Sequence, residues 1–190
     1  MVSPGVRTLL IVGGLLLVST TGAAASETRR IRITDDCDPA TFNKAIGPGT
    51  CVGRGETTFD EFIAQLKDDR KVDEWAFQPR RLTAKQSDTI VASNLGGEFH
   101  TLTEVRQFGG GFVPLLNGLS GNPVPVSECA DPAAKPDPVT GELPPAPAAL
   151  ATLVGPGKTI TADVPPVGHT ELYQCCIHPW MRMAITGKKG

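Results

Sequence analysis

The feature that most constrains the fold is a change in hydrophobic period near residue 72. Upstream, four apolar residues recur at helical spacing, and Thr58 and Glu61 form a capping box just ahead of them. Downstream, short runs rich in β-branched and aromatic residues are separated by Pro and Gly, which predicts strands. The chain is therefore expected to be an all-β antiparallel sandwich preceded by one amphipathic helix. The helical stripe consists of Phe59, Phe62, Ile63 and Leu66.

The N-terminus has the pattern of a cleaved secretory signal. Arg7 precedes an apolar run over 9–18, and small residues follow as far as Ala25. This run is shorter than the ~20 residues that a membrane helix needs. We expect a signal peptide over 1–25 and an exported protein, periplasmic or extracellular, with no membrane span.

The rest of the chain divides into two parts by composition. Residues 26–71 form an N-terminal extension with the amphipathic helix, and residues 72–190 form the β domain. A Pro- and Gly-rich insertion interrupts this domain at about 107–157, where the spacing of these residues argues against a regular helix or a central strand. The formal net charge is only −2 and both signs are mixed along the chain, so nothing indicates a nucleic-acid partner.

The cysteine count is odd. All five cysteines follow residue 25, where export would favour disulfides, so at least one thiol has another role. Cys37 and Cys51 flank a loop rich in Gly and Pro, which makes a local disulfide between them the natural expectation.

The segment YQCCIHPWM, residues 173–181, carries the strongest chemical signal. In a strand, adjacent Cys175 and Cys176 point to opposite faces, so only one of them can serve a given site. Cys175, His178 and Met181 can converge across a tight loop. A thiolate, imidazoles and a weak thioether are the ligand set that selects copper, provided that a second histidine joins them.

Two other histidines can supply that ligand. His100 starts a predicted strand behind the pair Gly96–Gly97, which allows close backbone approach. His169 lies in a turn, where a solvated side chain is the simpler interpretation. His100 is therefore the expected partner.

At this point the chain resembles the cupredoxins, the blue-copper proteins. The segment CCIHPWMR is similar to their C-terminal ligand loop, FQPRRLTAKQSDTIVASN to their entry strands, and HTLT to the strand with the first histidine. The resemblance implies a Greek-key β-sandwich with one type 1 copper ion at one end. It assigns His100, Cys175 and His178 as trigonal ligands and Met181 as the axial ligand.

Several alternatives stay open on the sequence. Met183 is a rival axial ligand at another spacing known in the family. A zinc site from Cys175, Cys176 and His178 is conceivable, although it leaves Met181 unused. Our allocation of disulfides, Cys37 with Cys51 and Cys129 with Cys176, leaves Cys175 for copper, but four cysteines allow three pairings.

The expected function is one-electron transfer by cycling between Cu(I) and Cu(II) with a transient redox partner protein. Four protein ligands leave no open position for substrate, so we do not expect an enzyme. Electrons are expected to enter through an exposed edge of His178, and Trp180 beside it would serve as either loop packing or docking surface. The alternatives are copper buffering or delivery without electron transfer, and a metal-free interaction domain.

Overall fold

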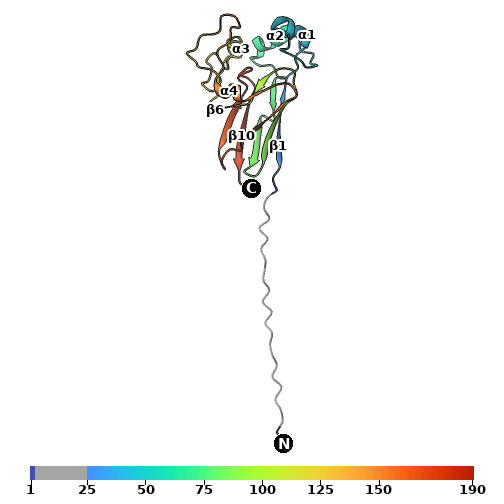
Figure 1. The fold of residues 1–190 in the computed structure, drawn as a ribbon, viewed down its shortest axis with the longest axis vertical. Helices are drawn as coiled ribbons and strands as arrows, with labels where there is room; N and C mark the ends of the chain where they lie inside the picture. The colour runs from blue at the N-terminus through green and yellow to red at the C-terminus, as the bar shows by residue number, and fades with distance from the viewer. Residues whose placement is uncertain (3–24) are drawn as a thin grey trace.

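A computed structural model describes residues 1–2 and 25–190; most of the predicted signal peptide lies outside the described residues. Two four-stranded sheets make up the body of the protein (Figure 1). The first contains, in spatial order, β2 (Ala76–Gln78), β1 (Thr28–Thr34), β4 (Thr89–Asn94) and β8 (Thr159–Ala162). The second contains β3 (Arg81–Lys85), β10 (Arg182–Lys188), β9 (Thr170–Gln174) and β6 (Thr103–Val105).

This all-β sandwich confirms the predicted fold class. Strands that are neighbours in a sheet are mostly not consecutive in sequence, so the chain crosses repeatedly between the sheets. Two pairs are parallel, β1 with β4 and β3 with β10, and the other pairs of both sheets are antiparallel. Aliphatic and aromatic side chains from both sheets fill the space between them, including Ile31, Phe77, Ile90 and Ile185.

The N-terminal part holds more structure than the sequence indicated. Strand β1 pairs with both β2 and β4, so residues before 72 contribute a strand to the first sheet. Its sequence TRRIRIT alternates exposed arginines with the buried Ile31 and Ile33, a short period-2 signal of a strand that was not predicted. The division at residues 71 and 72 stays a prediction, although β1 and β2 pair across it.

Two helices follow β1. The predicted helix is α2 (Phe59–Asp69), and its capping box between Thr58 and Glu61 is present. A second helix, α1 (Pro39–Ala45), was not predicted, because its short sequence has no apolar stripe; Asp38 caps it. No helix among the described residues is long and apolar enough to cross a membrane.

The insertion is more regular than its composition suggested. It contains α3 (Pro114–Leu119), α4 (Pro147–Ala151) and β7 (Leu153–Val154), which pairs with β5 (His100–Thr101). The expectation of no regular helix was wrong for these two short helices. Each has proline in its first turn, where the missing N–H has no partner to lose.

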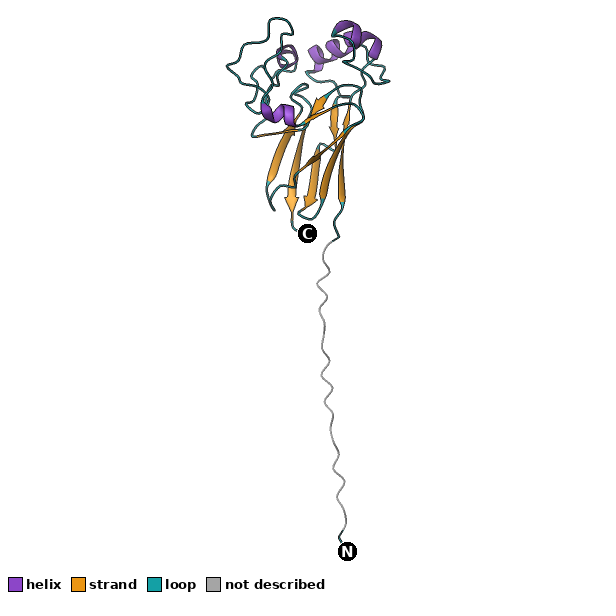
Figure 2. Ribbon diagram, viewed as in Figure 1, coloured by secondary structure: helices purple, strands orange, loops and turns teal. Residues whose placement is uncertain are grey.

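Two additions to the sandwich, the α1–α2 segment and the insertion, lie at one of its ends. Helices α1 and α2 stand on one side of this end and α3 on the other, while the C-terminus lies at the opposite end (Figures 1 and 2). We call the end with the helices the helical end.

Candidate metal centre

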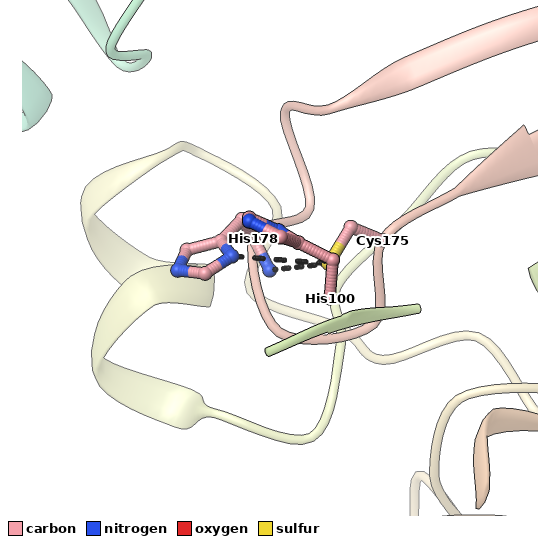
Figure 3. Close-up of side chains that lie close together, drawn as sticks. All are labelled: His100, Cys175 and His178. Carbon is pink, nitrogen blue, oxygen red and sulfur yellow. Dashed lines mark hydrogen bonds between the residues drawn. The ribbon is translucent and has the colours of Figure 1, made fainter. Parts of the chain in front are cut away.

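Three predicted ligands meet at the helical end. His100 lies on β5, and Cys175 and His178 lie in the loop between β9 and β10. Cys175 Sγ lies 3.9 Å from His100 Nδ1 and 3.8 Å from His178 Nδ1 (Figure 3). All three side chains are buried, with 2 % or less of each residue exposed.

These separations fit a metal ion bound by all three atoms. Metal–sulfur and metal–nitrogen distances of about 2.3 and 2.05 Å, at an angle of about 120°, put sulfur and nitrogen about 3.8 Å apart. The sulfur-to-nitrogen distances in the structure are 3.8 and 3.9 Å. The donor set of two imidazoles and one thiolate is the trigonal set typical of blue copper.

The loop that carries two of these ligands is closed by its own backbone. The Cys175 N–H donates to the carbonyl of Met181 at 3.0 Å, and the Met181 N–H donates to the carbonyl of His178 at 2.9 Å. Met181 is thereby held beside the cysteine, with 1 % of its surface exposed. Met183 lies within β10, opposite Tyr173, and both methionines belong to the buried core. The closed loop favours Met181 as the axial ligand, and this assignment stays a prediction.

Two backbone amides point at the cysteine sulfur. The N–H of Thr101 lies 3.4 Å from Cys175 Sγ and that of His178 lies 3.5 Å from it. Hydrogen bonds to a thiolate stabilise its charged form. They also withdraw electron density from a metal–sulfur bond, which is one way in which surrounding groups tune a copper site.

A buried carboxylate orients His100. Asp35 Oδ2 lies 2.8 Å from His100 Nε2, and the carboxylate also accepts from the N–H groups of Gly97 and Glu98. Because a carboxylate only accepts, Nε2 carries the hydrogen and Nδ1 faces the sulfur. A Cβ atom at Gly96 would lie 1.9 Å from Asp35 Oδ2, so the missing side chain at Gly96 allows this approach.

The charges of the cluster support one another. Burial alone would raise the pKa of Cys175, but hydrogen bonds from His100 and His178 hold this pKa well below its usual value of 9.0. Burial alone would lower the pKa of His100, but Asp35 and Cys175 raise it to about 9. Burial opposes the charge of Asp35 too, and His100 lowers its pKa to about 2. The site thus favours a thiolate, which is the form that binds metal.

A second carboxyl group faces His178. Glu98 Oε2 lies 3.6 Å from His178 Nε2 and accepts a hydrogen bond from Trp75 Nε1 at 2.6 Å. Burial raises the pKa of Glu98. Each histidine therefore presents Nδ1 to the sulfur and Nε2 toward a carboxyl group.

The expectation of an exposed edge on His178 was wrong. Helix α2 brings Phe62 against this ring at 6.4 Å between centroids, and Trp180, which also packs against Phe62, lies 5.4 Å from it. The indole N–H of Trp180 also donates to the carbonyl of Val72. These contacts favour the packing interpretation of Trp180. A sandwich without α2 would leave this side of His178 open.

The two adjacent cysteines separate as predicted. Cys175 packs in the core between the sheets, whereas Cys176 belongs to a second apolar cluster with the insertion. Cys176 is bonded to Cys129 and Cys37 to Cys51, and Cys175 is the one free cysteine among the described residues. The allocation of disulfides is confirmed. The zinc site that includes Cys176 is wrong, because its sulfur is in a disulfide.

Sequence reasoning missed the residues that surround the histidines. Asp35 follows β1 and reaches His100 only because β1 runs parallel to β4, and no local motif signals that pairing. Glu98 stands two residues before His100, and this closeness in sequence is a signal that could have identified it as a neighbour of the histidines. His169 is exposed in its turn, as expected for a solvated histidine.

No protein-family model matches the chain, and no curated protein does. Its matches among solved structures include a purple cupredoxin from Nitrosopumilus maritimus, 10 % identical, with a TM-score of 0.38, covering 84 % of this chain and 98 % of that one. A reduced auracyanin from Roseiflexus castenholzii is 17 % identical, with a TM-score of 0.36 and coverage of 87 % and 98 %. Auracyanin B is 13 % identical, with a TM-score of 0.33 and coverage of 88 % and 92 %.

Proposed function

We propose that this chain is an exported copper protein that transfers single electrons. His100, Cys175 and His178 would hold the ion, with Met181 as the weak axial ligand. The observation that carries the proposal is the buried cysteine sulfur with one imidazole Nδ1 at 3.8 Å and another at 3.9 Å. When bound, copper would supply a centre that gains and loses one electron between Cu(II) and Cu(I).

The protein's part is to keep the ligands in one arrangement. Asp35 holds the ring of His100, the Met181 backbone closes the ligand loop, and two amide N–H groups fix the sulfur. Ligands on rigid elements with hydrogen-bonded surroundings move little when charge changes. Four protein ligands would also leave no position for a substrate, which supports a carrier over an enzyme.

The burial of the site argues against copper delivery. An acceptor protein that takes the ion by ligand exchange has to reach the donor atoms. His100 and Cys175 have no exposed surface, and His178, against which Phe62 of α2 and Trp180 pack, is only 2 % exposed. Electron transfer does not need such contact, so a transient redox partner docking at the helical end is the better fit.

Export is part of the proposal and has its own support. Two disulfides join four of the five cysteines. Disulfides persist in oxidising compartments such as the periplasm or the cell exterior, and are rare in the cytosol. The free cysteine is the one whose thiolate the site uses.

Visible absorption of the purified mature protein with added Cu(II) tests the proposal. We expect an intense thiolate-to-copper band that is lost in Cys175→Ala and in His178→Ala. His169→Ala is the matched control, because His169 is exposed and remote from the sulfur, and it should keep the full band. Absence of the band in the parent, or its persistence in Cys175→Ala, would refute the assignment.

Reversible voltammetry separates the two functions of a copper-loaded protein. A carrier should show a reversible one-electron wave and hold its copper against a high-affinity chelator for hours. Rapid loss of copper to the chelator, with no reversible wave, would support buffering or delivery instead. The pair Met181→Leu and Met183→Leu identifies the axial ligand, since only the true ligand should shift the potential strongly.

A further inference from the structure

A cavity of about 470 Å³ lies at the helical end between the two additions to the sandwich. Residues of α1 and α2 form one side, and residues of the insertion form the other. Its lining reaches Glu98 and His178, at the edge of the proposed metal centre. The volume lies in the range of small-molecule sites, roughly 300–1,000 Å³.

The lining is strongly aromatic. Five of the chain's seven phenylalanines face this cavity. They come from four separate segments, so the fold gathers these rings at one place: Phe42, Phe59, Phe62, Phe99 and Phe112. Such rings favour a flat aromatic guest, which they contact edge-to-face or in offset stacks. Phe99 is 48 % exposed, and its uncovered surface is available to a guest.

One polar group in the lining has hydrogen-bonding capacity to spare. Glu98 is only 5 % exposed, and Trp75 bonds its Oε2. Among the described residues, no hydrogen bond reaches Oε1 of Glu98, and no fully enclosed side-chain oxygen lacks a partner. Oε1 therefore keeps some accessible surface, and Glu98 lines the cavity. A polar atom in an apolar cavity gains most from a guest that supplies a hydrogen bond.

We propose that this cavity binds a small planar aromatic molecule with a hydroxyl group, a phenol or a naphthol. The ring lies among the phenylalanines and the hydroxyl pairs with Glu98 Oε1. A hydroxyl both donates and accepts, so it pairs with a carboxyl group in either protonation state. Anionic guests are disfavoured, because Glu98 and Glu142 both line the cavity. This site goes beyond the proposed electron transfer and does not need copper to be present.

Titration calorimetry with 2-naphthol tests the proposal, on the mature protein with and without copper. We expect saturable binding with one molecule per chain in both forms. Replacement of the hydroxyl by a methyl group, in 2-methylnaphthalene, removes donor and acceptor together and should weaken binding about tenfold or more. This comparison changes the guest and leaves the protein fold untouched.

A matched pair of variants locates the guest. Ile46 lines the cavity and is 56 % exposed, whereas Val52 is 63 % exposed and does not line it. Ile46→Trp should fill the entrance and weaken 2-naphthol binding at least about tenfold, and Val52→Trp should leave it within about twofold. Near-ultraviolet circular dichroism verifies that both variants fold.

Several results would overturn the proposal. They are no saturable binding of 2-naphthol, equal affinity for 2-methylnaphthalene, or equal affinity in Ile46→Trp. Tighter binding of benzyltrimethylammonium than of 2-naphthol would instead assign the cavity to organic cations. The titration is also done without copper. Naphthol binding can therefore be absent while the copper absorption band is present, and it can be present while the band is absent, so the two proposals fail separately.

Discussion

The two ends of the sandwich each bury an aspartate whose pKa is about 2, but the two carboxylates differ in what they hold. At the helical end, Asp35 binds a histidine ring that faces a thiolate. At the opposite end, Asp88 accepts from backbone N–H groups of Lys85 and Glu27 and pairs with Arg29 at 2.9 Å.

The difference shows how one physical device serves two purposes. The partners of Asp88 are a permanent cation and amides, so its charge joins the start of β1 to the turn before β4 whatever else is bound. The partner of Asp35 is a titratable ring that a metal ion would also bind. We therefore expect both aspartates to contribute to the pH dependence of stability in acid, but only Asp35 to affect copper affinity.

The largest effect on the free energy of unfolding should come from the disulfides, which only the helical end has. The Cys129–Cys176 disulfide spans 47 residues, for which chain entropy gives about 4 kcal/mol of stability. Cys129→Ser/Cys176→Ser should lower the free energy of unfolding by up to about this amount, measured with urea.

The second disulfide is the matched control for the first. Cys37–Cys51 spans only 14 residues, so Cys37→Ser/Cys51→Ser should cost about 1 kcal/mol less. A larger loss from the shorter loop would show that contacts around α1, and not loop closure, set its contribution.

Asp35→Asn should weaken copper binding about 10- to 100-fold, the usual cost of losing a group that orients a ligating histidine. Asp88→Asn is the control and should leave copper affinity unchanged, since Asp88 lies at the other end. Competition with a chelator of known affinity measures both. Equal losses in the two variants would mean that Asp35 acts through overall stability alone.

Acid should act on both ends alike. Each folded pKa of about 2 lies below the usual value of 3.8, so the unfolded chain binds more protons between these values. The stability from these charges is complete above about pH 4 and is lost as the pH falls toward 2. Urea midpoints should fall in the parent as the pH is lowered from 5 to 2.5. In each Asn variant the unfolding free energy should depend less steeply on pH, by up to about one proton taken up on unfolding. An unchanged slope in Asp88→Asn would contradict this role.

The smallest effect concerns the helix that covers His178. Thr58→Ala removes one side of the capping box of α2 and should cost about 1 kcal/mol, seen as a lower urea midpoint. The copper band should not change, because no ligand lies on α2. A shifted band would show that packing by Phe62 sets the geometry of His178.

Local patterns predicted what is local in this molecule. The β-rich runs indicated strands after residue 72, the capping box located α2, and the spacing of Cys175, His178 and Met181 located the ligand loop. The contacts that complete the centre are not local. Asp35 reaches His100 through a parallel strand pair, and Phe62 covers His178 from a helix more than a hundred residues earlier in the chain. A periodic pattern shows which face of a segment is buried, but not which segment it meets.

Those non-local contacts also decide when the centre can exist. Its parts follow β1, begin β5 and lie between β9 and β10, so no fragment lacking the last hairpin contains it. The ligand loop joins β9 to β10, the last strand, and β10 also pairs with β3 from much earlier in the chain. Metal capture would then be a late step of maturation, and the colour of a copper-loaded sample would disappear together with the global fold.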